Sequence, residues 1–143
     1  MKFYTLSYVL CTAVAIFAAP ASNTASLSYD EAYDNAGTSL SSVACSDGSH
    51  GLLTKGYSTF GSLPAFPDVG GAFAVGGWNS AECGTCWKLT YKNKSINVLA
   101  IDHADAGTFN IALAAMNKLT GNKAKSLGRV EVSYKQVSTS DCK

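Results

Sequence analysis

Apolar and polar residues alternate in three segments of the second half of the chain. Trp87–Tyr91, Ile96–Asp102 and Arg129–Val137 each place apolar residues at every second position. A period of two residues is typical of a strand with one buried face. The polar turn Lys92-Asn93-Lys94 joins the first two segments, which are therefore predicted to form a β-hairpin.

One segment of this half has a helical period instead. Ile111, Ala115 and Leu119 fall on one face of a predicted helix over residues 110–119. Gly121 lies just past the end of this helix and is a C-cap signal. Asn110 lies at its start and is a residue type that caps helix N-termini, which is one of two roles considered for it.

The first half has a weaker pattern. Residues 22–26 are small and polar and predict a loose segment, whereas Leu27–Asp30 predicts a short strand. Residues 56–77 contain six glycines and two prolines and predict a long irregular connection with one helical turn. Such long connections in small domains are usually functional or cross-linked. We therefore expect one β-rich domain with a short helix, in the form of a small barrel.

The N-terminal segment predicts secretion. Lys2 precedes an uncharged, mostly apolar run from Phe3 to Ala19, and the small-residue motif Ala19-Pro20-Ala21 follows. This pattern is typical of a signal peptide, because the apolar run is too short to span a bilayer. The expected organisation is a signal peptide over residues 1–21, which is removed, and one domain over residues 22–143. We expect a secreted, extracellular protein without a membrane span.

The charge of the predicted mature chain argues against a polyanionic partner. The sequence has 11 Lys and Arg and 10 Asp and Glu, so loss of Lys2 leaves 11 − 1 = 10 basic residues and a net charge near zero. No basic cluster is present to neutralise a row of phosphates, and nucleic acid is not an expected partner. Many Gly, Ser, Thr and Asn residues with scattered aromatic residues fit a neutral partner such as carbohydrate.

The C-x-x-C motif at Cys83 and Cys86 allows three interpretations. A redox centre needs a thiolate at a helix N-terminus, but Cys86 opens a predicted strand. A structural zinc site needs four ligands, and the remaining Cys and His residues form no second C-x-x-C pair. Disulfide bonding is the third interpretation and the one we favour. No metal or cofactor is expected.

The cysteine count supports two disulfides. Cys11 falls in the predicted signal peptide, so Cys45, Cys83, Cys86 and Cys142 remain, an even number for an oxidising compartment. Four cysteines allow three pairings, and a bond between Cys83 and Cys86 would connect almost nothing. We expect each of these two cysteines to bond a distant partner.

Histidine and tryptophan side chains offer further candidates. His50 and His103 are potential acid or base groups, but each lies in a loop of small residues, where a histidine without a role is the expected state. Trp87 belongs to an alternating strand and is expected in the core. Trp78 lies in a Gly-rich loop and is more open to stacking on a sugar.

Six short motifs together resemble one known family. They are Ser28-Tyr29-Asp30, VACSDGSHGL over residues 43–52, GGWNS over 76–80, CGTCW over 83–87, IDHA over 101–104 and GTFNIA over 107–112. In that order and spacing, over essentially the whole mature chain, the sequence closely resembles the cerato-platanin family of small secreted fungal proteins. The resemblance implies a six-stranded double-psi β-barrel with short helices, related in architecture to expansin domains. It also implies the disulfides Cys45–Cys83 and Cys86–Cys142.

The same resemblance implies a binding function without hydrolysis. Members of the family bind N-acetylglucosamine oligomers, loosen cellulosic or chitinous walls, self-assemble at air–water interfaces and elicit plant defence. The expected partners are therefore chitin or N-acetylglucosamine oligomers, cellulose, and a plant receptor, together with self-assembly of the protein.

The family's sugar-binding groove corresponds to named positions of this chain. Its aspartate corresponds to Asp102, at the end of the hairpin strand, and its asparagine to Asn110, after Phe109. Tyr29 and Asp30 are placed in the same groove on the resemblance alone. A carboxylate accepts hydrogen bonds from sugar hydroxyls, and an amide both donates and accepts them. The other role considered for Asp102 is that of a turn residue.

Two other functions remain open from the sequence. A weak glycoside hydrolase would use Asp102 with Asp105 or Asp30 as the second carboxylate, roughly 5–10 Å away. A surface-active protein would act by assembly, although no long exposed apolar patch is evident. Separately, Asn93-Lys94-Ser95 is an N-glycosylation sequon at the predicted hairpin turn, where Asn93 is a possible acceptor.

Overall fold

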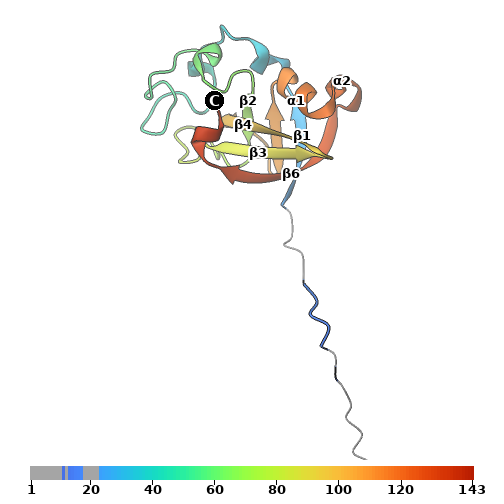
Figure 1. The fold of residues 1–143 in the computed structure, drawn as a ribbon. Coiled ribbons are helices and arrows are strands. Elements are labelled where there is room, and N and C mark those ends of the chain that lie inside the picture. Colours follow the sequence, from blue (N-terminus) through green and yellow to red (C-terminus); the bar gives the residue numbers. More distant parts are fainter. Residues whose placement is uncertain (1–10, 12, 18–22) are drawn as a thin grey trace, which may run out of the picture.

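The computed structural model describes residues 11, 13–17 and 23–143. Most of the predicted signal peptide, residues 1–21, and its cleavage site lie outside the described residues. Residues 24–142 form a closed barrel of six strands with short helices around it (Figure 1). Among the described residues, no helix is long and apolar enough to cross a membrane.

The barrel is closed in the order β1-β5-β2-β4-β3-β6. The strands are β1 (Thr24–Tyr29), β2 (Val69–Ala72), β3 (Cys86–Tyr91), β4 (Lys94–His103), β5 (Thr108–Ile111) and β6 (Arg129–Val137). β1 pairs with β5 and β2 with β4 in parallel, while the other four pairs are antiparallel. This is the predicted six-stranded double-psi β-barrel.

Most of the irregular segments between β1 and β2 gather at one end of the barrel, with α1 and α2 on one side of it (Figure 1). The α-helices are α1 (Leu113–Thr120) and α2 (Ala124–Leu127), and the 3-10 helices are η1 (Glu31–Asp34), η2 (Leu40–Ser42), η3 (Phe60–Ser62) and η4 (Thr139–Asp141). Inside the barrel, four aromatic rings contact one another with centroids 5.3–6.4 Å apart; they belong to Phe73, Trp87, Phe109 and Tyr134.

The elements predicted from a period of two residues are confirmed. β3 and β4 form the hairpin, and its turn contains Lys92 at a φ of 53°. β6 spans Arg129–Val137 as predicted, with its buried Val132 alternating with exposed Glu131 and half-buried Ser133. The C-cap prediction is also confirmed, because Gly121 ends α1 with a φ of 64° and its N–H bonds to the carbonyl of Asn117.

Two predictions for the first half are wrong. Residues 24–26 are not loose: they begin β1 and pair with both β5 and β6. The connection over residues 56–77 is not wholly irregular, because it contains β2, a barrel strand whose four residues are all buried. A strand buried on both faces has no alternation of polar and apolar residues, which removes the signal on which the strand predictions rest.

The helix over residues 110–119 begins later than predicted. Asn110 lies in β5, so it is not the N-cap, and α1 starts at Leu113. The backbone N–H groups of Leu113 and Ala114 donate instead to the carboxylate of Asp34, at 2.8 and 2.9 Å. A side chain 79 positions earlier in the sequence thus satisfies the free N–H groups of the first turn.

Replacing this remote cap is expected to destabilise the fold. Asp34→Ala should lower the free energy of unfolding by about 2 kcal/mol, because two charge-assisted hydrogen bonds are lost at a helix N-terminus. Urea unfolding measures the effect. The matched control is Asp68→Ala, which breaks only the ion pair with the half-exposed Lys118 and should cost at most about 1 kcal/mol. Equal losses in the two variants would contradict the capping role.

Of the two disulfides, one joins two irregular segments to each other and the other joins β3 to the segment after η4. They join Cys45 to Cys83 and Cys86 to Cys142, with Cα atoms 5.4 and 5.8 Å apart. This is the pairing that the family resemblance implies. Because both cysteines of the C-x-x-C motif are cross-linked, neither is a free thiol for redox chemistry or for a metal. Cys11, which the predicted cleavage would remove, is the one unpaired cysteine among the described residues.

Candidate functional site

An open groove of about 660 Å³ lies at the end of the barrel that carries the irregular segments. Its walls come from η1 and the residue before it, from the segments around η2 and η3, and from the last part of β4. The lining residues are Asp30, Glu31, Ala32, Tyr33, Asn35, Thr38, Ser42, Val43, Phe60 and Asp102. The groove thus combines carboxylates, hydroxyls and amide groups with apolar residues, of which Val43 is half-buried and Phe60 is buried.

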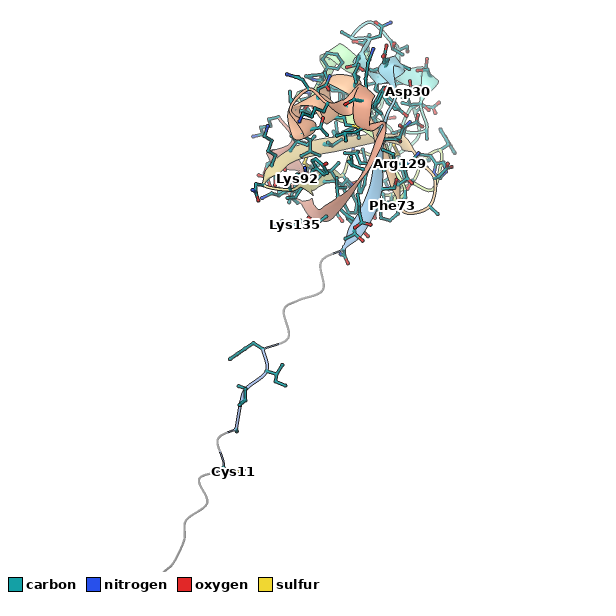
Figure 2. The ribbon with its side chains drawn as sticks, turned by 90° about the vertical axis from the view of Figure 1, so that its right-hand side faces the viewer. Cys11, Asp30, Phe73, Lys92, Arg129 and Lys135 are labelled. Carbon is teal, nitrogen blue, oxygen red and sulfur yellow. A yellow bond between two sulfur atoms is a disulfide. The ribbon has the colours of Figure 1, made fainter. Side chains whose placement is uncertain are left out.

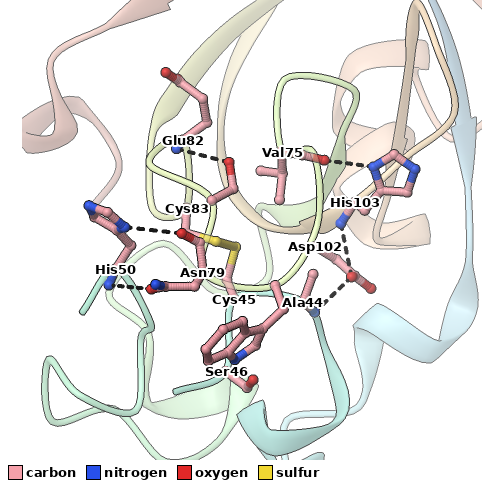
Figure 3. The surroundings of a disulfide bond; sticks show 12 residues. Ala44, Cys45, Ser46, His50, Val75, Asn79, Glu82, Cys83, Asp102 and His103 are labelled. Atoms are coloured by element: carbon pink, nitrogen blue, oxygen red, sulfur yellow. Dashed lines mark hydrogen bonds between the residues drawn. A yellow bond between two sulfur atoms is a disulfide. The ribbon is translucent and has the colours of Figure 1, made fainter. Parts of the chain in front are cut away.

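Asp102 holds three segments of the groove together. Its Oδ1 accepts hydrogen bonds from the backbone N–H groups of Ala44 and His103, both at 2.9 Å (Figure 3). Its Oδ2 accepts from the hydroxyl of Tyr33, also at 2.9 Å. Ala44 precedes the disulfide-bonded Cys45, so the cross-link helps to fix the N–H group that the carboxylate binds. The side chain is more than a turn residue, because it binds groups 58 and 69 positions away.

Tyr33 is the groove residue that the sequence prediction missed. Its ring is buried and packs against Phe60 with centroids 6.1 Å apart. Burial raises the pKa of the Tyr33 hydroxyl, and the neighbouring Asp102 carboxylate raises it further. The hydroxyl therefore remains a proton donor to Asp102. No local signal predicts this role, since the segment around Tyr33 is polar and Asp102 is 69 positions away.

The raised pKa of Tyr33 predicts a pH dependence of stability. In the unfolded chain a tyrosine loses its proton near pH 10, whereas folded Tyr33 keeps it, so the unfolded state binds fewer protons above that pH. The stabilisation is fully present below about pH 10 and declines as the pH rises further. Urea unfolding of the wild type and of Tyr33→Phe should show a stability difference that is constant up to about pH 9 and shrinks above about pH 10. A difference that stays constant to higher pH would contradict this assignment.

The structure brings only some of the predicted site residues into the groove. Asp30 and Asp102 line it, and Asp30 also caps η1 by accepting from the N–H of Ala32 at 2.9 Å. Tyr29 and Asn110 are not among the lining residues.

Asn110 lies beside the groove in the same part of the sheet. In the strand register, Gly71 of β2 is the partner of both Asp102 in β4 and Asn110 in β5, so the two residues lie in one row across the sheet, on either side of β2. The Oδ1 of Asn110 accepts from the hydroxyl of Ser28 at 2.9 Å. This contact uses the amide oxygen and leaves the amide nitrogen as a donor for a ligand.

The other candidate carboxylate and the histidines lie outside the groove lining. Asp105 is exposed in the turn between β4 and β5. His103 contacts the carbonyl of Val75 through Nδ1 at 2.6 Å, and His50 contacts the carbonyl of Asn79 through Nδ1 at 3.0 Å (Figure 3). Both imidazoles thus connect loops.

The tryptophans follow their predicted environments. Trp87 is 8% exposed inside the aromatic cluster, and its Nε1 donates to the hydroxyl of Thr85 at 2.8 Å. Trp78 is 64% exposed, and its Nε1 donates to the carboxylate of Asp47 at 2.6 Å.

The possible glycosylation site is remote from the groove. Asn93 is exposed in the hairpin turn next to Lys92, at a distance from Asp30 along the domain (Figure 2). β4 runs from the turn to Asp102, a length of about 26 Å for eight steps along a strand. A glycan on Asn93 would leave the groove accessible, and glycosylation stays a prediction.

Comparisons with known proteins identify the family. The family model described as Cerato-platanin matches residues 25–143. The allergen Asp f 15 homolog of Arthroderma benhamiae is 54% identical over 145 residues, which cover 99% of this chain and 69% of that protein. The crystal structure of cerato-platanin 1 from M. perniciosa has a TM-score of 0.80 and 48% identity, and covers 83% of this chain and 99% of that one. The solution structure of the fungal elicitor Cerato-Platanin has a TM-score of 0.74 and 45% identity, covering 82% and 95%. The chain therefore belongs to the cerato-platanin family.

Proposed function

We propose that this protein is a secreted, wall-associated carbohydrate-binding protein that does not cleave its ligand. The ligand is chitin or its N-acetylglucosamine oligomers, with cellulose as a related glucan, and binding takes place in the groove that contains Asp30 and Asp102. The observation that carries the proposal is the set of hydrogen bonds around Asp102, which fixes the orientation of this side chain at the groove.

The groove has the chemistry of a neutral sugar site. Carboxylate and amide groups of Asp30, Asp102 and Asn35 offer acceptors and donors to hydroxyl and acetamido groups. Val43, which is half-buried, adds apolar area against which a sugar ring can lie. The near-neutral charge of the predicted mature chain is consistent with an uncharged ligand.

The same contacts oppose hydrolysis. A glycosidase needs one carboxylic acid that gives its proton to the leaving oxygen and a second carboxylate on the other side of the bond. Both oxygens of Asp102 already accept hydrogen bonds from N–H and O–H donors of the protein, so the fold engages this side chain on both sides. Asp105 lies outside the groove lining, which leaves Asp30 as the only predicted partner, and its Oδ1 already caps η1.

Recognition by plants is the second part of the proposal. The relative whose solution structure is 45% identical is called a fungal elicitor. We infer that this chain is likewise exported, in agreement with its two disulfides, and is perceived by a plant receptor. The test compares defence responses in leaves infiltrated with the folded protein and with the reduced protein. Equal responses to the two would show that the plant does not recognise the fold.

The binding proposal is tested by NMR titration with N-acetylglucosamine oligomers. Backbone signals of Ala44 and His103 should shift, because their N–H groups bind the carboxylate at the groove. Asp102→Asn should weaken binding about tenfold through the loss of one charged acceptor. Asp105→Asn, which removes an equal charge outside the lining, is the matched control. Shifts that avoid the groove would refute the assignment.

Catalysis is tested separately by a reducing-end assay on chitin and cellulose. No product should accumulate with the wild type. Sustained release of sugar that disappears in Asp102→Asn would replace the binding function with a hydrolytic one.

A further inference from the structure

Trp78 is an exposed aromatic residue in a rigid setting outside the groove. Within residues 23–143 the large apolar side chains that are exposed are Trp78, at 64%, and Leu127, at 40%. A tryptophan this exposed has an apolar ring in water, which needs an explanation when the backbone around it is fixed.

The indole is held in one orientation by Asp47. Its Nε1 donates to Oδ1 of Asp47 at 2.6 Å, and this bond lowers the pKa of the Asp47 carboxyl. The carboxylate therefore stays ionised and keeps the indole in place over the usual pH range. A ring that is already oriented loses less conformational freedom when a ligand binds.

The two loops that carry this pair are fixed to each other. The disulfide Cys45–Cys83 joins them, and the backbone N–H of His50 donates to Oδ1 of Asn79 at 2.9 Å (Figure 3). The loops approach so closely that a Cβ on Gly48 would lie 2.6 Å from this Oδ1. Asn79 adopts a φ of 57°, a costly conformation for a residue with a side chain, immediately after Trp78.

Asp47, which contacts the indole, and Asn79, which follows Trp78 in the sequence and contacts His50, have polar atoms without a partner in the described part of the chain. Asn79 uses its Oδ1 and its carbonyl in the contacts with His50, and His50 uses its backbone N–H and Nδ1. The amide nitrogen of Asn79, Nε2 of His50 and Oδ2 of Asp47 are thus left for other partners. One oriented aromatic face with planar polar groups around it matches a pyranose ring, which has apolar C–H faces and a rim of hydroxyls.

Other partners fit this surface less well. A protein-binding hot spot needs an apolar patch around its central residue. The sequence neighbours of Trp78 are Gly77 and Asn79, and the hydrogen-bond partner of its indole is Asp47, so these residues supply no such patch. A nucleotide base would stack on the indole, but its phosphate would meet the Asp47 carboxylate.

We infer that Trp78, Asp47, His50 and Asn79, here called the tryptophan platform, form a second sugar-binding subsite, which stacks one pyranose ring of an N-acetylglucosamine oligomer on the indole. The inference rests on the proposed ligand class but not on the groove. Ala44 and Cys45 lie between the two sites, because Ala44 binds Asp102 and Cys45 is cross-linked to the loop that carries Asn79.

The indole N–H signals test the platform directly. On titration with the N-acetylglucosamine hexamer, the Nε1–H signal of Trp78 should shift, whereas that of the buried Trp87 should not. Trp78→Ala should weaken binding of the hexamer about tenfold. Its melting temperature should stay close to that of the wild type, because the side chain is mostly exposed.

The possible results separate the platform from the groove. Shifts at Ala44 and His103 with an unchanged Trp78 signal, and full affinity in Trp78→Ala, would overturn the platform and leave the groove intact. A shift of the Trp78 signal that persists in Asp102→Asn supports the platform. If the Trp78 signal shifts but the signals of Ala44 and His103 do not, the result overturns the groove and leaves the platform intact. No shift at either place would overturn both.

Discussion

Removal of the Cys86–Cys142 disulfide in the variant Cys86→Ala/Cys142→Ala is expected to lower the free energy of unfolding by about 4 kcal/mol. The bond closes a loop of 56 positions, and the unfolded chain gains conformational entropy when the loop is opened. For a domain of this size such a loss is a large part of a typical stability of about 5–15 kcal/mol. Calorimetry should record a fall in melting temperature of roughly 10–20 °C.

The Cys45–Cys83 bond provides the matched comparison. It closes 38 positions, so its removal should also cost about 4 kcal/mol. At a temperature where both disulfide variants are folded, only the variant without Cys45–Cys83 should bind the N-acetylglucosamine hexamer more weakly. The reason is that Cys45 adjoins Ala44 and Cys83 anchors the loop of Asn79. A reducing agent should reproduce the combined effect on the wild type. Unchanged stability of the reduced protein would refute the structural role of both bonds.

Gly70→Ala is expected to destabilise the barrel by about 3 kcal/mol or to prevent folding. A Cβ on Gly70 would lie 2.5 Å from the carbonyl oxygen of Asn110 and 2.5 Å from Cα of Ile111. These are backbone atoms of the paired strand β5, so the clash cannot be relieved by rotating a side chain. Expression yield and urea unfolding of the soluble fraction measure the effect.

Gly76→Ala is the control for this substitution. Nothing lies within 4 Å of a Cβ on Gly76, and its φ is not in the left-handed region. Its stability should therefore stay within about 0.5 kcal/mol of the wild type. If Gly70→Ala were as stable as Gly76→Ala, β2 would not be packed between β4 and β5 as described.

The glycines of β2 also explain why this strand could not be predicted. In VGGA all four residues are buried, and two of them have no side chain to form a pattern. Gly70 and Gly71 are there because β5 and β4 approach closely on the two sides; a Cβ on Gly71 would meet the carbonyl of His103 at 2.7 Å. The requirement for glycine arises from neighbours that are distant in sequence, so it appears locally only as a Gly-rich connection.

The start of α1 was misplaced for a related reason. Asn110 is a good N-cap residue by type and precedes an apolar helical pattern, but it pairs in β5 with Gly71 and Ser28. The groups that cap α1 come from Asp34, which lies in a polar segment without a helical signal of its own. A cap supplied from another part of the chain leaves no motif near the helix.

The sequence by itself determined the features that depend on neighbouring residues. These are the hairpin and the last strand, from their period of two, and the C-terminal end of α1 at Gly121. The resemblance added the six-stranded double-psi topology and the pairing of the cysteines, because it draws on spacings along essentially the whole predicted mature chain. The buried position of Trp87 and the exposed position of Trp78 also followed from their local surroundings.

Only the tertiary structure decided which residues form the candidate sites. It placed Tyr33 against Asp102, put Asn110 beside the groove instead of in its lining, and joined Trp78 to Asp47 across 31 positions. The sequence around each of these side chains does not indicate which partner it contacts in the fold. Their geometry is set by the strand register and by the disulfide between Cys45 and Cys83, which both bring together segments that are distant in the sequence.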